Sequence, residues 1–427
     1  MRSVDDQLAL VTDAAVAPKP VRISIVDALG MMCAEEVEAD RALPGFAQAA
    51  IDGYAVRAVD VGGEAGLSGR HALADGEGNP APASAPSLPV VGEIQAGSQQ
   101  PLRLQPKQAM GVQTGAPLPS LADAVLPLAW SDRGRRRVVA RRPVRSGDFV
   151  RRAGDDIRPG DVAVSAGSIL GPAQVGLLAA VGRGKVLVYP RPRVSIISVG
   201  SELVDITRQP GLGQVVDVNS YALAAAAKEA GAEPHRVGIA AGEPRRLREI
   251  IESQLMRSEI LVIAGAVGGR ASYTVRQVLS RLGDIDTERV AMHPGSVQGF
   301  GLLGENRAPV FLLPSNPVSA LVIFEVFVRP VIRRSLGRRA ALRREVNARI
   351  LNHLDSQPGR EGFVRAQLMR DAETGDYLVE ARGGAGGAPA HLLAGLAEAN
   401  AMVHLPAETT HVAPGEVVSV RFLGQRS

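Results

Sequence analysis

Apolar runs typical of β-strands alternate with helical segments from residue 193 to residue 335, and this alternation restricts the fold more than any other feature. The strands are predicted at 194–199, 236–240, 260–264 and 309–313, and the helices at 219–230, 244–256, 272–282 and 317–335. Continuous apolar strands joined by helices indicate a parallel sheet that is covered on both faces. Ligands of such sheets bind at the carboxyl ends of the strands, so the candidate binding loops are 200–202, 265–272 and 314–319.

Local signals set the ends of several of these helices. Asn219 and Asn316 are predicted N-caps, because their side chains can accept hydrogen bonds from the free N–H groups of a first helical turn. Pro317 favours the first turn of a helix, and Gly231 favours its C-terminal end. The predicted cap at Asn316 is structural and compatible with phosphate binding at the same helix end.

The residues on either side of this alternation have the composition of smaller β-rich domains. Residues 46–144 contain short apolar runs between Gly and Pro, and residues 339–427 contain short strands of alternating pattern. Two prolines, Pro190 and Pro192, mark a boundary before the α/β part. We therefore predict four domains: a discontinuous linker (1–45 with 145–189), a small β-rich domain (46–144), an α/β domain (190–338) and a β-barrel-like domain (339–427).

Composition excludes several classes of protein. Hydrophobic residues make up 45% of the chain, which is enough for several cores. Aromatic residues make up only 3%, too few for the stacking platforms that bind single-stranded nucleic acid. The single cysteine, Cys33, excludes a disulfide framework. Neither a secretory signal nor an 18-residue apolar run is visible, so we predict a cytoplasmic protein without a membrane partner.

Arginine carries most of the basic charge, and it is densest between Arg133 and Arg152. Nucleic-acid or anion binding is one interpretation of such a run. A solvated hairpin is the other, and we favour it because Val138, Val139 and Val144 interrupt the arginines with strand-like residues. Nucleic acid is therefore an unlikely partner.

A glycine-rich turn follows the strand at 260–264, and a helix follows the turn. Free backbone N–H groups in such a turn surround an anion, so Gly265, Gly268 and Gly269 are candidate binding residues. The segment from 260 to 283 contains no Asp and no Glu. This segment therefore supplies no carboxylate to the predicted anion site.

Four strings go beyond a generic α/β pattern. They are PGFAQAAIDGYAVRAVD at 44–60, TGAPLP at 114–119, VRSGDFVRRAGDDI at 144–157 and LLPSNPVSA at 312–320. Together with the domain order, they resemble the MoeA/gephyrin-E family of molybdopterin molybdenumtransferases over nearly the whole chain.

This resemblance implies an architecture and a reaction. The architecture is an elongated homodimer of four-domain subunits with a central three-layer α/β molybdopterin-binding domain, a parallel-rich sheet, two small β-rich domains and an elongated linker domain. The active cleft is expected between the α/β domain of one subunit and the small β domain of the other. The implied reaction takes adenylated molybdopterin (molybdopterin-AMP) and molybdate, with a divalent cation such as Mg²⁺, cleaves the adenylate and places molybdenum on the dithiolene sulfurs. Candidate partner proteins are a molybdopterin adenylyltransferase and apo-molybdoenzymes.

The resemblance also assigns roles to residues of this chain. The implied catalytic residues are Asp52, Thr114, Asp156 and Glu202, with Glu202 on the metal side. The implied cofactor-binding residues are Gly265, Gly268, Gly269, Arg270, Ser272, Arg289, His293, Pro314, Asn316, Pro317 and Ser319. Simpler roles compete at three positions, because Asp52 can be a turn residue, Thr114 a turn cap and Asp156 a cap at an interdomain hinge.

The chain departs from the family pattern at polar positions that belong to one inferred cleft. The replacements are Ser201, Ser272 and Ser315, His293 and Ser296 in place of two lysines, and Ala129 in place of a glutamate. Fewer acids weaken Mg²⁺ binding, and fewer lysines weaken anion binding, although Arg270 and Arg289 can compensate in part. Two hypotheses follow: a transferase with an altered site, or a catalytically impaired relative that binds molybdopterin or the finished cofactor for storage or delivery.

Overall fold

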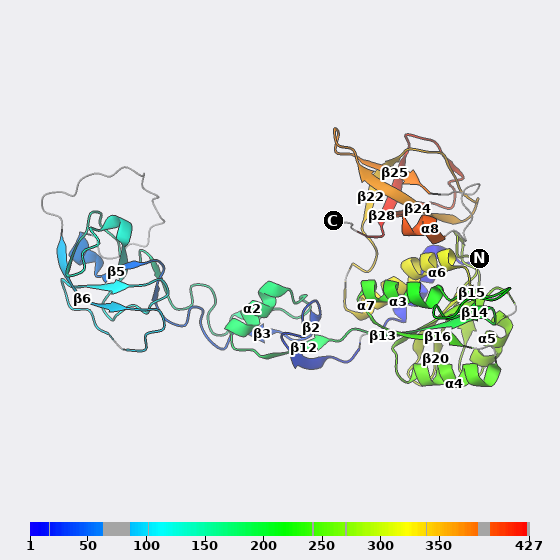
Figure 1. Ribbon diagram of the computed structural model, residues 1–427, viewed down its shortest axis with the longest axis horizontal. Coiled ribbons are helices and arrows are strands. Elements are labelled where there is room, and N and C mark those ends of the chain that lie inside the picture. Colours follow the sequence, from blue (N-terminus) through cyan, green and yellow to red (C-terminus); the bar gives the residue numbers. More distant parts are fainter. Residues whose placement is uncertain are drawn as a thin grey trace. The chain divides into compact units, whose positions relative to one another are not determined.

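The computed structural model describes residues 1–16, 18–62, 86–100, 102–240, 243–269, 271–338, 340–382 and 393–424 (Figure 1). The chain separates into two compact units. The first unit is Met1–Val21 with Val188–Ser427, and the second unit is Arg22–Leu187.

A six-stranded sheet forms the centre of the first unit (Figure 1). Its order is β16 (Glu233–Ala240), β13 (Arg193–Val199), β17 (Ile260–Val267), β21 (Ala308–Pro314), β20 (Gly299–Leu303) and β18 (Ile285–Asp286). The first four strands are parallel, and the last two are antiparallel edge strands that the sequence pattern did not indicate. All eight residues of β17 are buried, as expected for a central parallel strand.

Helices cover both faces of this sheet and enclose two cores. One core packs α3 (Asn219–Ala230), α6 (Pro317–Ile323) and α7 (Arg329–Ser335) against the sheet, with a π-helical segment, η3 (Phe324–Val328), between the last two. The N-terminal helix α1 (Val4–Asp13) adds Val4 and Val11 to this core. The other core lies under α4 (Pro244–Leu255) and α5 (Ala271–Leu279). The predicted α/β architecture is confirmed, with the predicted helix 317–335 interrupted by the π segment.

Five strands of the C-terminal part close into a barrel. They are β22 (Glu345–Ile350), β24 (Glu361–Arg370), β25 (Tyr377–Ala381), β26 (Ala401–Leu405) and β28 (Val417–Phe422), and a β24–β26 pairing completes the ring. Short strands β23 (Leu354–Asp355) and β27 (His411–Val412) pair with each other, and a short helix α8 spans Leu393–Ala397. One strand of the α/β part, β19 (Met292–His293), pairs in parallel with the start of β24.

In its described residues, the second unit is built from small sheets, the α-helix α2 and two short 3₁₀ helices. Its largest sheet has the order β8 (Ala124–Pro127), β5 (Gly53–Val56), β7 (Ala109–Val112), β6 (Ser87–Ile94) and β9 (Arg137–Val139). The remaining elements are β1 (Val21–Ser24), β2 (Met32–Cys33), β3 (Val37–Glu38), β4 (Gln48–Ala49), η1 (Ala58–Val61), η2 (Leu128–Trp130), β10 (Val150–Arg151), β11 (Val162–Val164), α2 (Pro172–Ala180) and β12 (Lys185–Tyr189). Val138 and Val144 are buried, so the arginine-rich run is anchored by a core.

Two local predictions need correction. The strand at 260 does not end at Ala264 but continues to Val267, so Gly265 lies inside β17 and not in the turn. Asn219 is the first residue of α3 and not its cap, because Val218 occupies that position and Asp217 supplies the capping oxygen to the Ser220 N–H. The other end signals are confirmed, since Asn316 caps α6 and Gly231 ends α3 in the left-handed conformation.

Candidate functional site

A pocket of about 580 Å³ opens at the carboxyl ends of β13, β17 and β21. It is called the edge pocket below. Its lining residues are Ser198, Val199, Glu202, Leu203, Val215, Val216, Val218, Asn219, Ala264, Gly265, Ser315, Asn316, Pro317 and Leu393. All three candidate binding loops therefore reach this pocket, as the parallel topology requires. The short parallel pair β14 (Leu203–Val204) and β15 (Val215–Val216) supplies its apolar wall.

The carboxylate of Asp217 fixes one side of the edge pocket. Asp217 is 1% exposed and accepts hydrogen bonds from the Ser198 hydroxyl at 2.7 Å, the Ser220 N–H at 3.1 Å and the Ser220 hydroxyl. A buried carboxylate needs such donors to offset its lost hydration. Asp217 thereby ties the end of β13 to the start of α3. Sequence reasoning missed it, although an Asp two positions before the helix was a visible signal.

Glu202 brings a carboxylate to the mouth of the edge pocket. Its side chain is exposed and folds back over Gly200, where a Cβ atom would lie 2.7 and 2.8 Å from the two carboxylate oxygens. Only glycine at position 200 leaves this space open. Neighbouring Ser201, which stands in place of a family acid, is also exposed.

Gly265 is required by the approach of β17 to β13. Its φ is +78°, and a Cβ at this position would lie 2.1 Å from the Val199 carbonyl oxygen. Gly268 and Gly269 follow in the left-handed region with open space around them. Only these last two therefore form the turn before α5, where the Ser272 hydroxyl donates to the Gly269 carbonyl at 2.6 Å. Arg270 lies outside the described residues.

We expect Gly265→Ala to destabilise the first unit by about 3 kcal/mol, because it adds a backbone clash to the cost of a left-handed alanine. Gly268→Ala is the matched control, with similar φ but no nearby atom, and should cost only about 1 kcal/mol. Hydrogen exchange of the β13 and β17 amides measures the difference. Equal effects of the two variants would contradict the packing role of Gly265.

The side chains of two asparagines make hydrogen bonds that hold the third candidate binding loop, residues 314–319. The Asn316 Oδ1 accepts from the Ser319 N–H at 3.0 Å and caps α6, whose first residue is Pro317. The Asn219 amide donates to the Ser315 carbonyl at 2.8 Å and joins α3 to this loop. Ser319 is buried, and Pro314 ends β21.

Arg289 and His293 lie on a segment apart from the pocket lining, between β18 and β20. Arg289 is exposed, whereas His293 is partly buried in β19. Burial, reinforced by the charge of Arg360, lowers the pKa of His293 below its ordinary value of 6.5. His293 is therefore neutral at pH 7 and does not replace the charge of the family lysine.

This shift predicts a pH dependence of stability. The unfolded state binds a proton at His293 more readily than the folded state. The free energy of unfolding is therefore unaffected by His293 well above pH 6.5, and it decreases as the pH falls from 6.5 through the lower folded pKa. A His293→Gln variant should lose less stability than the unaltered protein between pH 7 and pH 5, as measured by thermal unfolding. An identical pH profile in both proteins would contradict the shift.

Asp52 and Thr114 form the polar pair of the second unit. One carboxylate oxygen of Asp52 accepts from the Thr114 N–H at 2.7 Å and from its hydroxyl at 2.8 Å. These two bonds lower the pKa of Asp52 below 3.8. Asp52 is exposed, and both bonds go to Oδ1, so its second oxygen can receive another donor or a cation. Asp156 is also exposed, and its N–H donates to the Leu43 carbonyl at 3.0 Å.

Within the described residues, no cluster of three or more His, Cys, Asp or Glu side chains could hold a metal ion by itself. Mg²⁺ commonly binds through one or two carboxylates together with phosphate oxygens and water. Glu202 fits that pattern, whereas Asp217 is buried and already accepts three hydrogen bonds. No helix in the described part of the chain is long and apolar enough to cross a membrane.

Known proteins match this chain along its whole length. Residues 2–182 match the MoeA N-terminal region (domain I and II), residues 195–334 a probable molybdopterin binding domain, and residues 347–423 the MoeA C-terminal region (domain IV). A Mycobacterium tuberculosis protein named molybdopterin molybdenumtransferase 1 is 60% identical over 425 residues and covers 100% of both chains. The chain belongs to the MoeA family.

Other MoeA-family members confirm the breadth of the match. Molybdopterin molybdenumtransferase 2 of Mycobacterium tuberculosis is 34% identical and covers 98% of this chain and 99% of its own. A crystal structure of a molybdopterin biosynthesis MoeA protein from Pyrococcus horikoshii has 29% identity, a TM-score of 0.80 and 99% coverage of both chains. The fold predicted from the sequence resemblance is thus confirmed.

Proposed function

We propose that this chain is a molybdopterin molybdenumtransferase, which inserts molybdenum from molybdate into adenylated molybdopterin and releases AMP. The observation that carries the proposal is the full-length relative of 60% identity that bears this name. The alternative of an impaired storage or delivery protein is not favoured, because relatives named as transferases match from end to end. Purified protein should release AMP only when adenylated molybdopterin and molybdate are both present.

The edge pocket supports this proposal by its shape and its polar groups. Apolar side chains such as Val199, Leu203 and Val216 form walls suited to a flat pterin ring. The N–H groups of the Gly268–Gly269 turn and the N-terminus of α5 are suited to phosphate oxygens. A pterin bound here would present its phosphate side chain to the glycine turn.

Glu202 is proposed to hold the divalent cation, with phosphate oxygens and water as the other ligands. Bound Mg²⁺ would offset the charge that develops on the phosphate oxygens during cleavage of the adenylate. The protein's own contribution is the space beside Gly200 in which the Glu202 carboxylate lies. A chelator should therefore suppress AMP release, and added Mg²⁺ should restore it.

The Gly200→Ala variant should change the position of the Glu202 side chain with little effect on the stability of the fold. The new Cβ would displace only a flexible carboxylate, so we expect thermal unfolding to change little. AMP release should fall about tenfold, because a displacement near 1 Å of a catalytic group has effects of this order or larger. Unchanged kcat in this variant would argue against the placement of Glu202.

Three further parts of the proposal concern the second unit and the assembly. Asp52, Thr114 and Asp156 are proposed to act in the same reaction, and Asp52→Asn tests the strongest of these assignments.

We propose a homodimer, which predicts twice the 44.7 kDa chain mass in light scattering. A cytoplasmic location, the four domain boundaries and partnership with a molybdopterin adenylyltransferase or apo-molybdoenzymes belong to the same proposal.

A further inference from the structure

A groove of about 380 Å³ lies between α4 and α5, which pack together over the second core of the first unit (Figure 1). It is called the helix groove below. Its lining residues are Pro244, Arg245, Arg248, Gln277, Val278 and Arg281. None of these residues lines the edge pocket, so the helix groove is a separate feature of the surface.

The described lining of the helix groove carries three arginines and no acid. Arg245 and Arg248 are three positions apart on α4, so their side chains are neighbours on the helix surface. Arg281 follows the end of α5 and faces the same groove from the other side. Because residues 260–283 contain no Asp and no Glu, the α5 side supplies no countercharge. The groove therefore gathers positive charge.

Two of these three arginines have no partner within the part of the chain that the structure describes. The Arg248 Nε donates to the Glu252 carboxylate at 2.8 Å. Arg245 and Arg281 are exposed, and neither makes a hydrogen bond or an ion pair with a described residue. Their guanidinium groups keep all their donors for a ligand.

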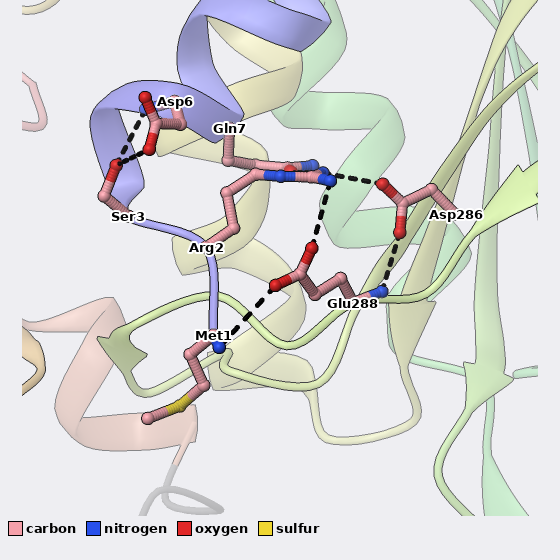
Figure 2. A network of polar contacts seen from close by, with 7 residues as sticks. All are labelled: Met1, Arg2, Ser3, Asp6, Gln7, Asp286 and Glu288. Atoms are coloured by element: carbon pink, nitrogen blue, oxygen red, sulfur yellow. Dashed lines mark hydrogen bonds and ion pairs between the residues drawn. The ribbon is translucent and has the colours of Figure 1, made fainter.

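Two other arginines of the first unit show the contrasting, structural use of this side chain. Arg2 contacts Asp286 at 2.7 Å and Glu288 at 3.2 Å (Figure 2). Arg193 contacts Glu259 at 2.6 Å. In both places the sequence brings an acid to the arginine. In the helix groove, the only such acid is on Arg248, and the like charges of the other two arginines favour an anion from solution.

The shape of the helix groove suits a phosphate group with an organic part attached. Its volume is within the range of about 300–1,000 Å³ that is usual for small-molecule sites, and it exceeds the volume of a phosphate ion. Pro244 and the buried Val278 supply apolar surface. Pro244 is also the first residue of α4, a 12-residue helix whose N-cap, Glu243, makes no side-chain capping bond. The positive end of this helix adds to the field of the arginines.

We propose that the helix groove is an accessory anion site, which binds the phosphate group of a small molecule through Arg245, Arg248 and Arg281. Guanidinium groups match phosphate oxygens with paired hydrogen bonds, and three of them around one groove can contact a doubly charged group from two helices. The inference does not depend on the proposed transferase reaction, because the groove shares no lining residue with the edge pocket.

Calorimetry of the full-length protein with inorganic phosphate and with glucose 6-phosphate tests the proposal, with glucose as the uncharged control. The Arg245→Ala/Arg281→Ala protein should bind both phosphates about tenfold more weakly, as expected for the loss of two exposed charge contacts. Gln277→Glu, which places an acid in the groove, should also weaken binding. Glucose 6-phosphate that binds at least as tightly as phosphate identifies an organic phosphate as the ligand, whereas binding of inorganic phosphate alone identifies the free ion.

Arg246→Ala/Arg276→Ala is the matched control. Both residues are exposed on the same two helices, and neither lines the groove, so this protein loses the same charge. Its phosphate affinity should stay within about twofold of the unaltered protein. Phosphate bound at the Gly268–Gly269 turn would be retained by both double variants, so only a loss confined to the Arg245→Ala/Arg281→Ala protein supports the site.

Two results would overturn the inference. One is an equal loss of phosphate affinity in both double variants, which would show attraction by net charge alone. The other is the absence of phosphate binding by the unaltered protein. Molybdate-dependent AMP release should keep its unaltered kcat in both double variants, and loss of AMP release in the Arg245→Ala/Arg281→Ala protein alone would overturn the separation of the helix groove from the edge pocket.

Discussion

Replacement of Glu202 by Gln should lower kcat for molybdate-dependent AMP release by about 100-fold or more, because the edge pocket then lacks its only exposed carboxylate among the described lining residues. The substitution keeps the size of the side chain and removes the charge that Mg²⁺ requires. Binding of molybdopterin should change far less, since the apolar walls and the glycine turn are unaffected. Rapid-quench measurement of AMP, with the Mg²⁺ concentration varied, separates weak metal binding from slow chemistry.

Glu305→Gln is the control for this variant. Glu305 is exposed in the turn between β20 and β21, at the end of β21 opposite the edge pocket. It should leave kcat unchanged. A Glu202→Gln protein with more than about a third of the normal kcat at saturating Mg²⁺ would contradict the assignment of Glu202 as the metal-side carboxylate.

Replacement of Asp217 by Ala should destabilise the first unit by about 3 kcal/mol or more. The substitution removes three hydrogen bonds to a buried carboxylate and leaves the Ser198 and Ser220 hydroxyls without their acceptor. It also opens the link between β13 and α3, so the apolar wall of the edge pocket should loosen. Thermal unfolding and hydrogen exchange of the β13 amides measure these effects.

Ser198→Ala provides the comparison within the same cluster. It removes one donor and leaves Asp217 with both bonds from Ser220, so a loss of about 1.5 kcal/mol is expected. The single Trp130 lies in the second unit, and its fluorescence reports whether that unit is affected. If Ser198→Ala were as damaging as Asp217→Ala, the carboxylate would not be the centre of this cluster.

The sequence predicts most accurately those structural features that are determined by residues close together in the chain. Strand and helix alternation predicted the parallel sheet and the three loops that reach the edge pocket, and capping chemistry predicted the roles of Asn316 and Gly231. The same local reasoning wrongly placed Gly265 in a turn. Glycine is required there because a Cβ would clash with the Val199 carbonyl, which belongs to another strand. It also chose Asn219 as a cap, although the buried Asp217 performs that role.

Long-range contacts account for what the sequence did not reveal. Arg2 and Glu288 are 286 positions apart, and no pattern in either segment indicates that they meet. The pairing of Asp52 with Thr114 likewise joins two strings that resemble the family separately. Family resemblance predicted roles for Asp52 and Thr114, but only the folded chain shows that the Asp52 carboxylate accepts its hydrogen bonds from Thr114.

The most direct test of the account is AMP release by the purified protein from adenylated molybdopterin, with Mg²⁺ present and with or without molybdate. We predict AMP release that depends on molybdate, is abolished by a chelator and is reduced about 100-fold or more in the Glu202→Gln protein. Release no greater with molybdate than without it would contradict the proposed transferase function.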